Sequence, residues 1–331
     1  MLNEVSVGII GTGSYVPDKI MTNKELEQIV DTSDKWIVER TGIRERRITL
    51  EGQATSDLAT EAAKRALDNA GISADELDLI IVATITPDML FPSVACLVQA
   101  NLKATKAAAF DLSAACSGFV YGIVTASQFI KSGLYEKILV IGAENLSKIL
   151  DWTDRNTCVL FGDGAGAAVV AKTSPGYGIL GVNLGADGSG ASFLSVPAGG
   201  SRIPASAETI NNRQHFMQMN GPEVYKFAVK VMGASALKAI ANANLSPADI
   251  SYVVPHQANI RIIESAAKRL GISMDKVAVS VTKYANTSSA SIPIGLDEAF
   301  RSGNIKKDDI VVVVGFGAGL TWASSVMKWS I

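Results

Sequence analysis

The 331-residue sequence has few of the side chains that build disulfide frameworks or metal centres: three Cys and two His. An odd number of thiols without paired spacing argues against a disulfide framework, and so few soft ligands argue against a multi-ligand zinc site. We therefore predict free thiols, a reducing compartment and no bound metal.

An excess of positive charge and long apolar runs are also missing. The formal net charge is −2, so no global positive field exists to attract a polyanion, and we expect no nucleic-acid partner. The longest apolar runs, such as 311–319, fall short of the roughly 20 residues that a membrane helix needs. The first 17 residues lack the basic start of a signal peptide. These absences predict a cytoplasmic protein without a membrane partner.

Hydrophobic residues make up 48% of the chain, which is ample for a large core. Short apolar runs without alternation predict strands covered on both faces, and helical patterns lie between them. The alternation indicates an α/β fold. The expected strands are 5–10, 79–83, 107–110, 138–141, 167–170, 253–254 and 310–314, and the expected helices include 56–70, 118–132, 223–242, 260–270 and 293–301.

Two stretches of the chain repeat in the same order. Residues 66–81 resemble residues 239–254 at an offset of 173, and Ile130-Lys-Ser-Gly resembles Phe300-Arg-Ser-Gly at an offset of 170. Chance similarity of two αβ segments is the competing explanation. We predict a duplicated α/β unit, with an N-terminal half at 1–175 and a C-terminal half at 176–331.

Two glycine-rich segments invite a nucleotide-binding interpretation. Gly11-Thr-Gly13 follows a strand, but the third glycine of the dinucleotide motif is missing and Pro17 stands where a helix should continue. We therefore expect a turn that ends the strand. The segment 161–166 precedes a strand rather than a helix, and we expect a tight hairpin there.

Cys116 lies between a buried strand and the helix expected at 118–132, among small residues. A thiol at a helix N-terminus has a lowered pKa, which favours a nucleophile, although a buried structural cysteine is the usual role of any single Cys. We expect that structural role for Cys96, in a helical pattern, and for Cys158, in a strand-like one.

His256 ends a strand in Pro-His-Gln-Ala-Asn, where α/β sheets place their chemistry, whereas His215 lies in a polar stretch and is expected in a surface turn. An offset of 170 from Cys116 leads to Asn286, which by itself could be a helix cap. If a pseudo-twofold axis relates the halves, Cys116 and Asn286 lie at equivalent helix N-termini, and His256 reaches the same centre. The turn at 315–319 could supply an oxyanion-hole N–H group.

Together, Asp-x-x-Ala-Ala-Cys116-x-Gly-Phe, Pro-His256-Gln-Ala-Asn259, Asn286-Thr-Ser and Gly-Phe-Gly-Ala-Gly-Leu-Thr-Trp resemble the β-ketoacyl-acyl-carrier-protein synthase III family over essentially the whole chain. The resemblance implies a thiolase-like fold, in which a duplicated α/β unit forms five layers, αβαβα, and a homodimer. It also implies that the chain initiates fatty acid biosynthesis by decarboxylative Claisen condensation of a short acyl-CoA with malonyl-acyl-carrier-protein.

By resemblance, Cys116 carries the acyl group, and the N–H groups of Cys116 and Ala318 hold the thioester oxygen. His256 and Asn286 bind the malonyl thioester carbonyl and stabilise the carbanion left by CO₂. No metal or redox cofactor is implied. Position 318 is Ala and position 222 is Pro where some relatives have Gly and Asn, so a side-chain contact to CoA from position 222 is lost.

The resemblance also assigns residues that contact the substrates. The CoA contacts are Thr32, Trp36, Arg155, Gly221 and Asn259. Phe91 would cross a dimer interface to floor the acyl pocket of the other subunit. A basic face for the carrier protein would comprise Lys226, Arg261, Lys268 and Arg269, although a solvated helix face explains the same charges.

Other functions remain open from sequence. A type III polyketide synthase or a secondary-metabolite acyltransferase would share the Cys-His-Asn set, and a non-catalytic acyl- or carrier-binding protein would share the fold. The sequence leaves the primer open between acetyl and branched acyl groups.

Overall fold

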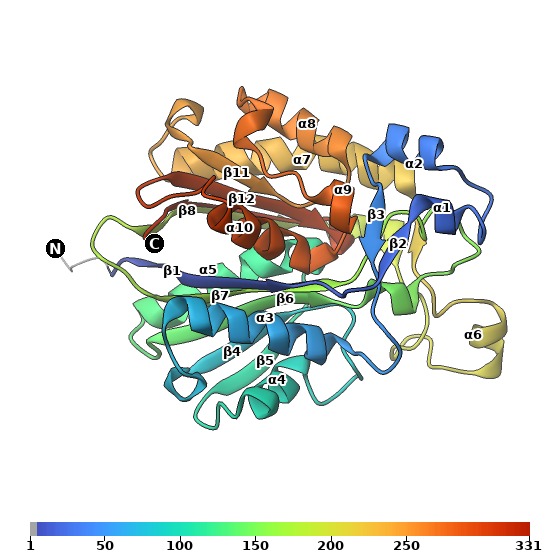
Figure 1. The fold of residues 1–331 in the computed structure, drawn as a ribbon, viewed down its shortest axis with the longest axis horizontal. Helices are drawn as coiled ribbons and strands as arrows, with labels where there is room; N and C mark the ends of the chain where they lie inside the picture. Colours follow the sequence, from blue (N-terminus) through green and yellow to red (C-terminus); the bar gives the residue numbers. More distant parts are fainter. Residues whose placement is uncertain (1–4) are drawn as a thin grey trace.

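The computed structural model describes residues 5–331, whose main strands form two mixed sheets (Figure 1). In the first sheet β4 runs parallel to β5 and β6, while β7 is antiparallel to β6 and β1; in the second β11 and β12 are parallel, and β13 is antiparallel to β12 and β8. The first sheet has the order β1 (Val7–Tyr15), β7 (Gly164–Lys172), β6 (Lys137–Glu144), β4 (Leu79–Ala83), β5 (Ala108–Leu112). The second has the order β11 (Tyr252–Pro255), β12 (Ile310–Gly317), β13 (Thr321–Lys328), β8 (Gly178–Ala186).

Helices cover both sheets and fill the space between them. The helices α3 (Thr55–Ala70) and α4 (Val94–Leu102) cover the first sheet, α5 (Gly118–Lys131) and α10 (Ser291–Arg301) lie between the sheets, and α7 (Gly221–Asn242) and α8 (Ile260–Leu270) cover the second (Figure 1). The five layers αβαβα confirm the predicted fold. Shorter elements are α1 (Asn23–Leu26), α2 (Asp34–Thr41), α6 (Ala207–Asn211), α9 (Val281–Tyr284), β2 (Ile20–Thr22), β3 (Glu45–Arg47), β9 (Leu194–Ser195) and β10 (Gln218–Met219).

The two sheets repeat one pattern at a constant spacing. From β4 to β11, from β6 to β12 and from α5 to α10, the first residues are 173 apart (252 − 79, 310 − 137 and 291 − 118). At this offset the counterpart of Cys116 is Ser289, so the residue-by-residue match with Asn286 was wrong, although both residues do precede central helices. At the same offset His256 corresponds to Ala83, the last residue of β4. We place the proposed division of the halves at 175/176, between the end of β7 and the start of β8.

The glycine-rich segments differ from the prediction. Residues Gly11–Tyr15 continue β1 beside β7 instead of turning. Glycine is required there because α3 packs directly on the strand: a β-carbon on Gly13 would lie 2.3 Å from the backbone nitrogen of Ala66. The expected hairpin at 161–166 is also absent, since Gly164 already starts β7 and Phe161 forms a bridge with Asn286.

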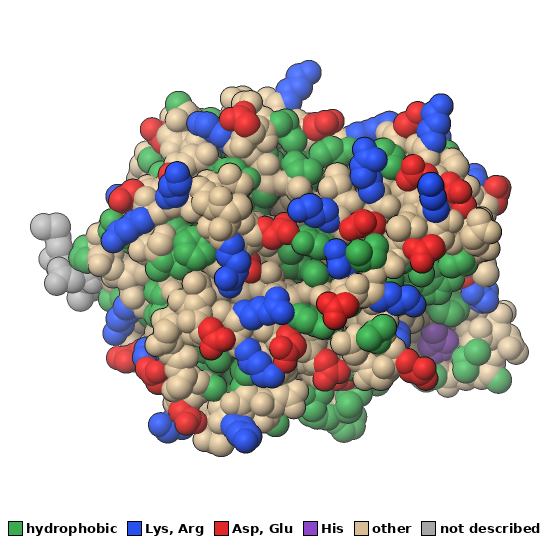
Figure 2. Space-filling model, viewed as in Figure 1, with side chains coloured by type: hydrophobic (Ala, Val, Ile, Leu, Met, Phe, Trp, Pro, Cys, Tyr) green, Lys and Arg blue, Asp and Glu red, His purple; other side chains and the backbone are tan. Residues whose placement is uncertain are grey.

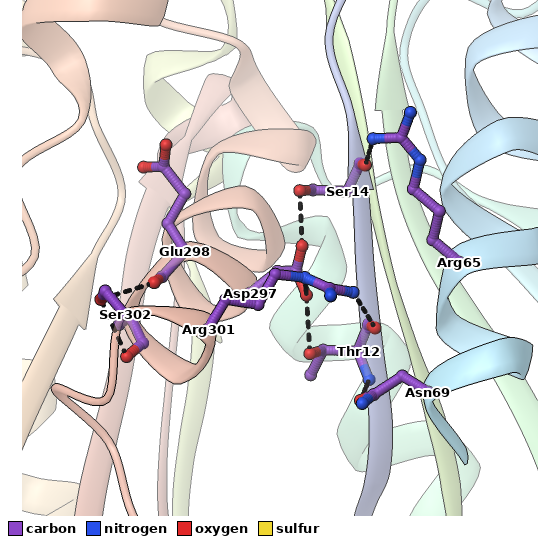
Figure 3. A network of polar contacts seen from close by, with 9 residues as sticks. Thr12, Ser14, Arg65, Asn69, Asp297, Glu298, Arg301 and Ser302 are labelled. Atoms are coloured by element: carbon purple, nitrogen blue, oxygen red, sulfur yellow. Dashed lines mark hydrogen bonds and ion pairs between the residues drawn. The ribbon is translucent and has the colours of Figure 1, made fainter. Parts of the chain in front are cut away.

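A polar network joins the halves where α10 meets β1 (Figure 3). The Asp297 carboxyl is buried and accepts hydrogen bonds from Thr12 Oγ1 (2.8 Å) and Ser14 Oγ (2.6 Å) of β1. Arg301, one turn further along α10, donates to the same carboxyl. Asn69 of α3 accepts from the backbone N–H of Thr12. The central helix of the second sheet is thereby fixed to a strand of the first.

Within residues 5–331, no helix combines the length and apolar character required to cross a bilayer.

Candidate active site

Cys116, His256 and Asn286 line one cavity of about 180 Å³. Cys116 lies in a short 3₁₀ helix immediately before α5, His256 directly follows β11, and Asn286 precedes the 3₁₀ turn Ser288–Ala290 that leads into α10. Their exposed fractions are 5%, 1% and 7%. The structure therefore brings together the three residues that the sequence placed at a shared centre.

The backbone around this centre is strained. Ala115, Ala285, Ser288 and Leu320 all have φ between 47° and 55°, a region costly for residues other than glycine. Gly317 closely approaches the backbone of Cys116, because a β-carbon on Gly317 would lie 2.6 Å from the Cys116 nitrogen. Such backbone strain persists only where the surrounding packing holds it, so the packing around these residues fixes the backbone of the site.

The Cys116 thiol does not have the lowered pKa expected at a helix N-terminus. Burial, with the nearby carboxyl of Glu144 acting in the same direction, raises the pKa of the thiol to about 12, while contact with Ser288 opposes the rise. Desolvation thus outweighs the helix dipole. The thiol of Cys116 is therefore protonated at neutral pH.

His256 is held as a neutral imidazole. Burial lowers its pKa to about 3. Its Nδ1 lies 2.6 Å from Ser291 Oγ, which also accepts a 3.4 Å hydrogen bond from the backbone N–H of Gln257. Within residues 5–331, Nδ1 is the only acceptor within hydrogen-bond distance of the Ser291 hydroxyl, so we assign the hydroxyl hydrogen to that contact and the ring hydrogen to Nε2. The sequence analysis missed Ser291; its place at the first turn of the helix after Asn286 was the available signal.

The Asn286 side chain is oriented from both sides. Its Oδ1 accepts from the backbone N–H of Ser288 (2.8 Å), and its backbone bonds to Leu160 and Gly162. No residue among 5–331 accepts a hydrogen bond from its Nδ2. Two N–H donors, His256 Nε2 and Asn286 Nδ2, are thus available in the cavity that contains the thiol.

A wider groove of about 720 Å³ adjoins this cavity and shares Leu160, Met219 and Gly221 with it. Trp36 lies in the groove, with the guanidinium carbon of Arg155 5.5 Å and that of Arg40 4.7 Å from its ring centroid. The sequence analysis did not single out Arg40. Such guanidinium–aromatic contacts bind flat, electron-rich rings and place positive charge beside them.

Two predicted CoA contacts fit less simply. Thr32 does not line either space, and its buried Oγ1 has no hydrogen-bond partner in the described chain. Asn259 lines the inner cavity, but its Oδ1 caps α8 and its Nδ2 donates to the Arg40 carbonyl. The Asn259 side chain is therefore already occupied within the protein.

A second cavity, of about 190 Å³, is also lined by Cys116. Phe91 is not part of it: this side chain is 84% exposed on the loop between β4 and α4. Apart from Ser195 and Ser288 the lining is apolar or sulfur-bearing, and consists of Ile85, Ala115, Cys116, Leu146, Ile149, Phe161, Leu194, Ser195, Val196, Met217, Ser288 and Ala318.

The predicted basic residues are exposed on two neighbouring helices. Lys226 is on α7, and Arg261, Lys268 and Arg269 are on α8. Arg261 and Arg269 also donate to the backbone carbonyls of Glu39 and Lys230. The guanidinium groups of Arg261 and Arg269 are thereby held against the protein surface rather than fully solvated.

The remaining Cys and His residues have other surroundings. Cys158 is buried, in a turn rather than the expected strand, whereas Cys96 is exposed on α4, so its prediction as a buried thiol was wrong. His215 lies half-buried in a turn. Residues 5–331 contain no group of three His, Cys, Asp or Glu side chains arranged to hold a metal ion.

The sequence of this chain matches one family of known proteins over most of its length. Residues 110–188 and 240–329 match the family models described as 3-oxoacyl-[acyl-carrier-protein] synthase III and its C-terminal region. The beta-ketoacyl-[acyl-carrier-protein] synthase III of Caldanaerobacter subterraneus subsp. tengcongensis is 61% identical, with 100% of both chains covered.

Solved structures show the same similarity. The 3-oxoacyl-[acyl-carrier-protein] synthase III from Aquifex aeolicus is 48% identical, with a TM-score of 0.91 over 98% of this chain and 100% of that one. A priming β-ketosynthase from the R1128 polyketide pathway is 34% identical, with a TM-score of 0.91 over 100% and 98%. This chain belongs to the 3-oxoacyl-[acyl-carrier-protein] synthase III family.

Proposed function

We propose that this chain condenses a short acyl-CoA primer with malonyl-acyl-carrier-protein, giving 3-oxoacyl-acyl-carrier-protein, CO₂ and CoA, and so initiates fatty acid biosynthesis in the cytoplasm. One observation carries the proposal: a buried thiol, a neutral imidazole and an oriented amide share a cavity that adjoins both a wider groove and a second, mostly apolar cavity. That arrangement suits a thioester entering from the groove and leaving its acyl chain in the apolar space.

In the first half-reaction Cys116 loses its proton and attacks the acyl-CoA thioester carbonyl. The C–S bond to CoA breaks, CoA leaves as the thiol, and an acyl-Cys116 remains. The backbone N–H groups of Cys116 and Ala318, which line the same cavity, bind the oxygen that becomes negative in the tetrahedral intermediate.

In the second half-reaction His256 and Asn286 donate to the thioester carbonyl of the malonyl substrate. The carboxylate leaves as CO₂, and the electron pair of the broken C–C bond forms an enolate whose negative oxygen the two donors stabilise. The enolate carbon attacks the acyl-Cys carbonyl and releases Cys116. No cofactor is required, because the departing CO₂ supplies the electron pair.

We propose that CoA occupies the groove with its adenine stacked on Trp36, after Arg155 swings away from the ring that it covers at 5.5 Å and closes on the other face of the adenine. Arg40 is near enough to meet a CoA phosphate. Gly221 lines both the groove and the inner cavity, which supports its predicted contact with the pantetheine arm. The structure adds nothing to the predicted CoA contacts of Thr32, which lines neither space, and of the Asn259 side chain, which bonds to Arg261 and Arg40.

The carrier protein is proposed to dock on the exposed basic residues of α7 and α8: Lys226, Arg261, Lys268 and Arg269. Positive and negative side chains are interspersed over the face seen in Figure 2, and the net charge is −2. An acidic partner would therefore be attracted by a local cluster rather than by the molecule as a whole.

We further propose a homodimer in which Phe91 enters the acyl space of the other subunit. Met89, Leu90 and Phe91 are exposed large apolar side chains on one loop, an arrangement that a soluble monomer rarely leaves uncovered. The neighbouring strand β5 is an end strand of the first sheet, so its free edge can pair with a second copy.

The assigned roles predict that His256→Ala and Asn286→Ala still accept an acyl group on Cys116 but lose condensation. Removing one such donor lowers the rate by about 10²–10³-fold. Intact mass after incubation with acetyl-CoA measures acylation, and CO₂ release from malonyl-acyl-carrier-protein measures decarboxylation. Cys116→Ala is the control and should gain no acyl mass.

Unacylated wild-type protein would overturn the enzyme proposal in favour of a binding protein. Normal decarboxylation in both donor variants would overturn the roles of His256 and Asn286. The choice of malonyl donor separates the rival enzymes: malonyl-CoA, used in place of the carrier-bound substrate, would favour a polyketide-type activity.

A further inference from the structure

Glu144, the last residue of β6, is fully buried and has no part in the proposed reaction. Its Oε2 accepts three hydrogen bonds from the loop after β4: from Thr84 Oγ1 (3.2 Å), the Ile85 N–H (3.1 Å) and Thr86 Oγ1 (2.6 Å). Its Oε1 lies 2.8 Å from the hydroxyl of Ser289. The carboxyl therefore joins the end of β4 to the turn that follows Asn286.

The hydrogens at Ser289 determine the protonation of this carboxyl. Ser289 Oγ is 2.8 Å from both Glu144 Oε1 and the Ala83 carbonyl oxygen. This is the length of a full O–H···O bond, so each contact needs its own hydrogen. The hydroxyl has one hydrogen and the carbonyl has none. A hydrogen on Glu144 Oε1 completes both bonds: Glu144 donates to Ser289, and Ser289 donates to Ala83.

The charges around Glu144 agree with that count. None of the ion pairs formed within residues 5–331 includes it. A buried carboxylate without a cation is costly, so burial raises the pKa of Glu144. Asp163 is the nearest other buried carboxyl in the chain order, and it precedes Gly164, the residue of β7 that pairs with Glu144. Asp163 does not bond to Glu144; it accepts hydrogen bonds from Thr49 and Ser147.

Glu144 also faces the nucleophile. The Ser288 side chain lies near both Glu144 and the Cys116 thiol and lowers the pKa of each, although its buried Oγ forms no full hydrogen bond within the described chain. A charge on Glu144 raises the pKa of the same thiol. Cys116 is the titratable group that faces Glu144 from the α5 side. The neighbours of Glu144 from the β4 loop and from the Ser288–Ala290 turn are hydroxyls and a backbone amide, which carry no charge.

We propose that Glu144 is a neutral carboxylic acid in the resting protein, and that its protonation keeps a negative charge away from Cys116 when the thiolate forms. The inference rests on the proposed role of Cys116 as nucleophile. At alkaline pH Glu144 loses its proton, and the new charge opposes ionisation of the thiol. As the pH rises, the reactivity of the Cys116 thiol therefore increases less than it would if the side chain at position 144 stayed neutral.

The test compares wild type with Glu144→Gln, whose amide can donate to Ser289 and accept from the other three donors without charge. The rate of iodoacetamide labelling of Cys116 is followed by mass from neutral to alkaline pH. We expect equal rates on the acid side and roughly tenfold faster labelling of the variant once Glu144 ionises, which corresponds to about one pKa unit. Asp163→Asn, a nearby buried carboxyl, should follow wild type. Superimposable curves for Glu144→Gln and wild type would overturn the effect on the thiol.

Protonation itself is read from infrared difference spectra of wild type minus Glu144→Gln at neutral pH. The C=O band of a protonated acid is expected, and a carboxylate band would overturn the proposal. If the variant does not fold, wild type labelled with carboxyl-¹³C glutamate gives the same answer by NMR, because exposed glutamates are ionised at neutral pH. Failure of acetyl-CoA to acylate Cys116 would instead reject the proposed function, whatever the state of Glu144.

Discussion

At the scale of single residues, the reactive groups of this protein are set by their neighbours rather than by their own chemistry. Cys116 and His256 are both neutral because burial disfavours their charged forms, which raises the pKa of the thiol and lowers that of the imidazole. A neutral pair leaves the imidazole free to donate through Nε2. The site therefore has little charge of its own, which suits the proposed stabilisation of charge that develops on substrate.

Ser291 is expected to hold His256 in the donating tautomer. Ser291→Ala removes the hydrogen bond to Nδ1 and allows the ring hydrogen to move there, so decarboxylation should slow by roughly fivefold to tenfold, the effect of about 1 kcal/mol. Acylation of Cys116 should be unchanged. Because the pKa of His256 is about 3, protonation of this ring should not slow wild type as the pH falls from 8 to 5.

CO₂ release from malonyl-acyl-carrier-protein and intact mass after acetyl-CoA give the two readouts. Ser291→Thr, which keeps a hydroxyl, is the matched control and should restore most of the rate. A rate for Ser291→Ala equal to that of wild type would show that the tautomer is fixed by another contact.

Sequence patterns identified Cys116, His256 and Asn286 because each follows a strand or precedes a helix in a recognisable motif. They could not identify Ser291, Glu144 or Arg40, since these residues are defined by contacts across the fold and not by local spacing. The pKa of Cys116 was misjudged for the same reason: helix position is visible in a sequence, whereas the degree of burial is not.

At the scale of elements, apolar runs located seven strands but not β8 and β13. In β13, Ser324 and Ser325 are fully buried, and Ser324 bonds to Ser235 of α7. The two serines interrupt the apolar pattern of β13, so the sequence has no apolar run to detect there, although the strand is buried. The offset of 170 is local: it aligns the ends of α5 and α10, because α10 (11 residues) is three residues shorter than α5 (14 residues). The starts of the elements keep a spacing of 173, and so do the 3₁₀ turns before the two helices, Ala115–Ser117 and Ser288–Ala290.

The close contact of α3 with β1 predicts a strong effect of one methyl group. In Gly13→Ala the new β-carbon would meet backbone atoms of α3, 2.3 Å from Ala66 N and 2.5 Å from Ala62 O. Backbone cannot move aside as a side chain can, so the free energy of unfolding should fall by about 1–3 kcal/mol. Urea unfolding at constant slope measures the change.

The matched control is Gly188→Ala, at a glycine whose β-carbon would have no atom within 4 Å. It should change the free energy of unfolding by less than about 0.5 kcal/mol. Equal stability of the two variants would mean that α3 shifts on β1 without cost, contrary to the tight packing described here.

At the scale of the whole molecule, one chain provides the thiol and both donors, but it also exposes an apolar loop and the free edge of a strand. The Asp297 network joins the two sheets into one body (Figure 3), and yet the edge of β5 and the apolar loop at 89–91 remain open. Sequence reasoning assigned Phe91 to a neighbouring subunit by resemblance alone. Its 84% exposure gives that assignment a physical basis.

Phe91→Asp should therefore weaken self-association, because it places a charge in an apolar contact. Sedimentation at micromolar concentrations should show a dimer for wild type and a shift towards monomer for the variant. Leu134→Asp, at a side chain 62% exposed in the turn after α5, is the control and should remain dimeric.

Phe91→Ala adds a second readout: removing the ring should change the KM for longer acyl-CoA primers more than the KM for acetyl-CoA, if Phe91 closes the acyl space. A monomeric wild type would refute the dimer, and a dimeric Phe91→Asp with unaltered primer kinetics would remove Phe91 from the interface.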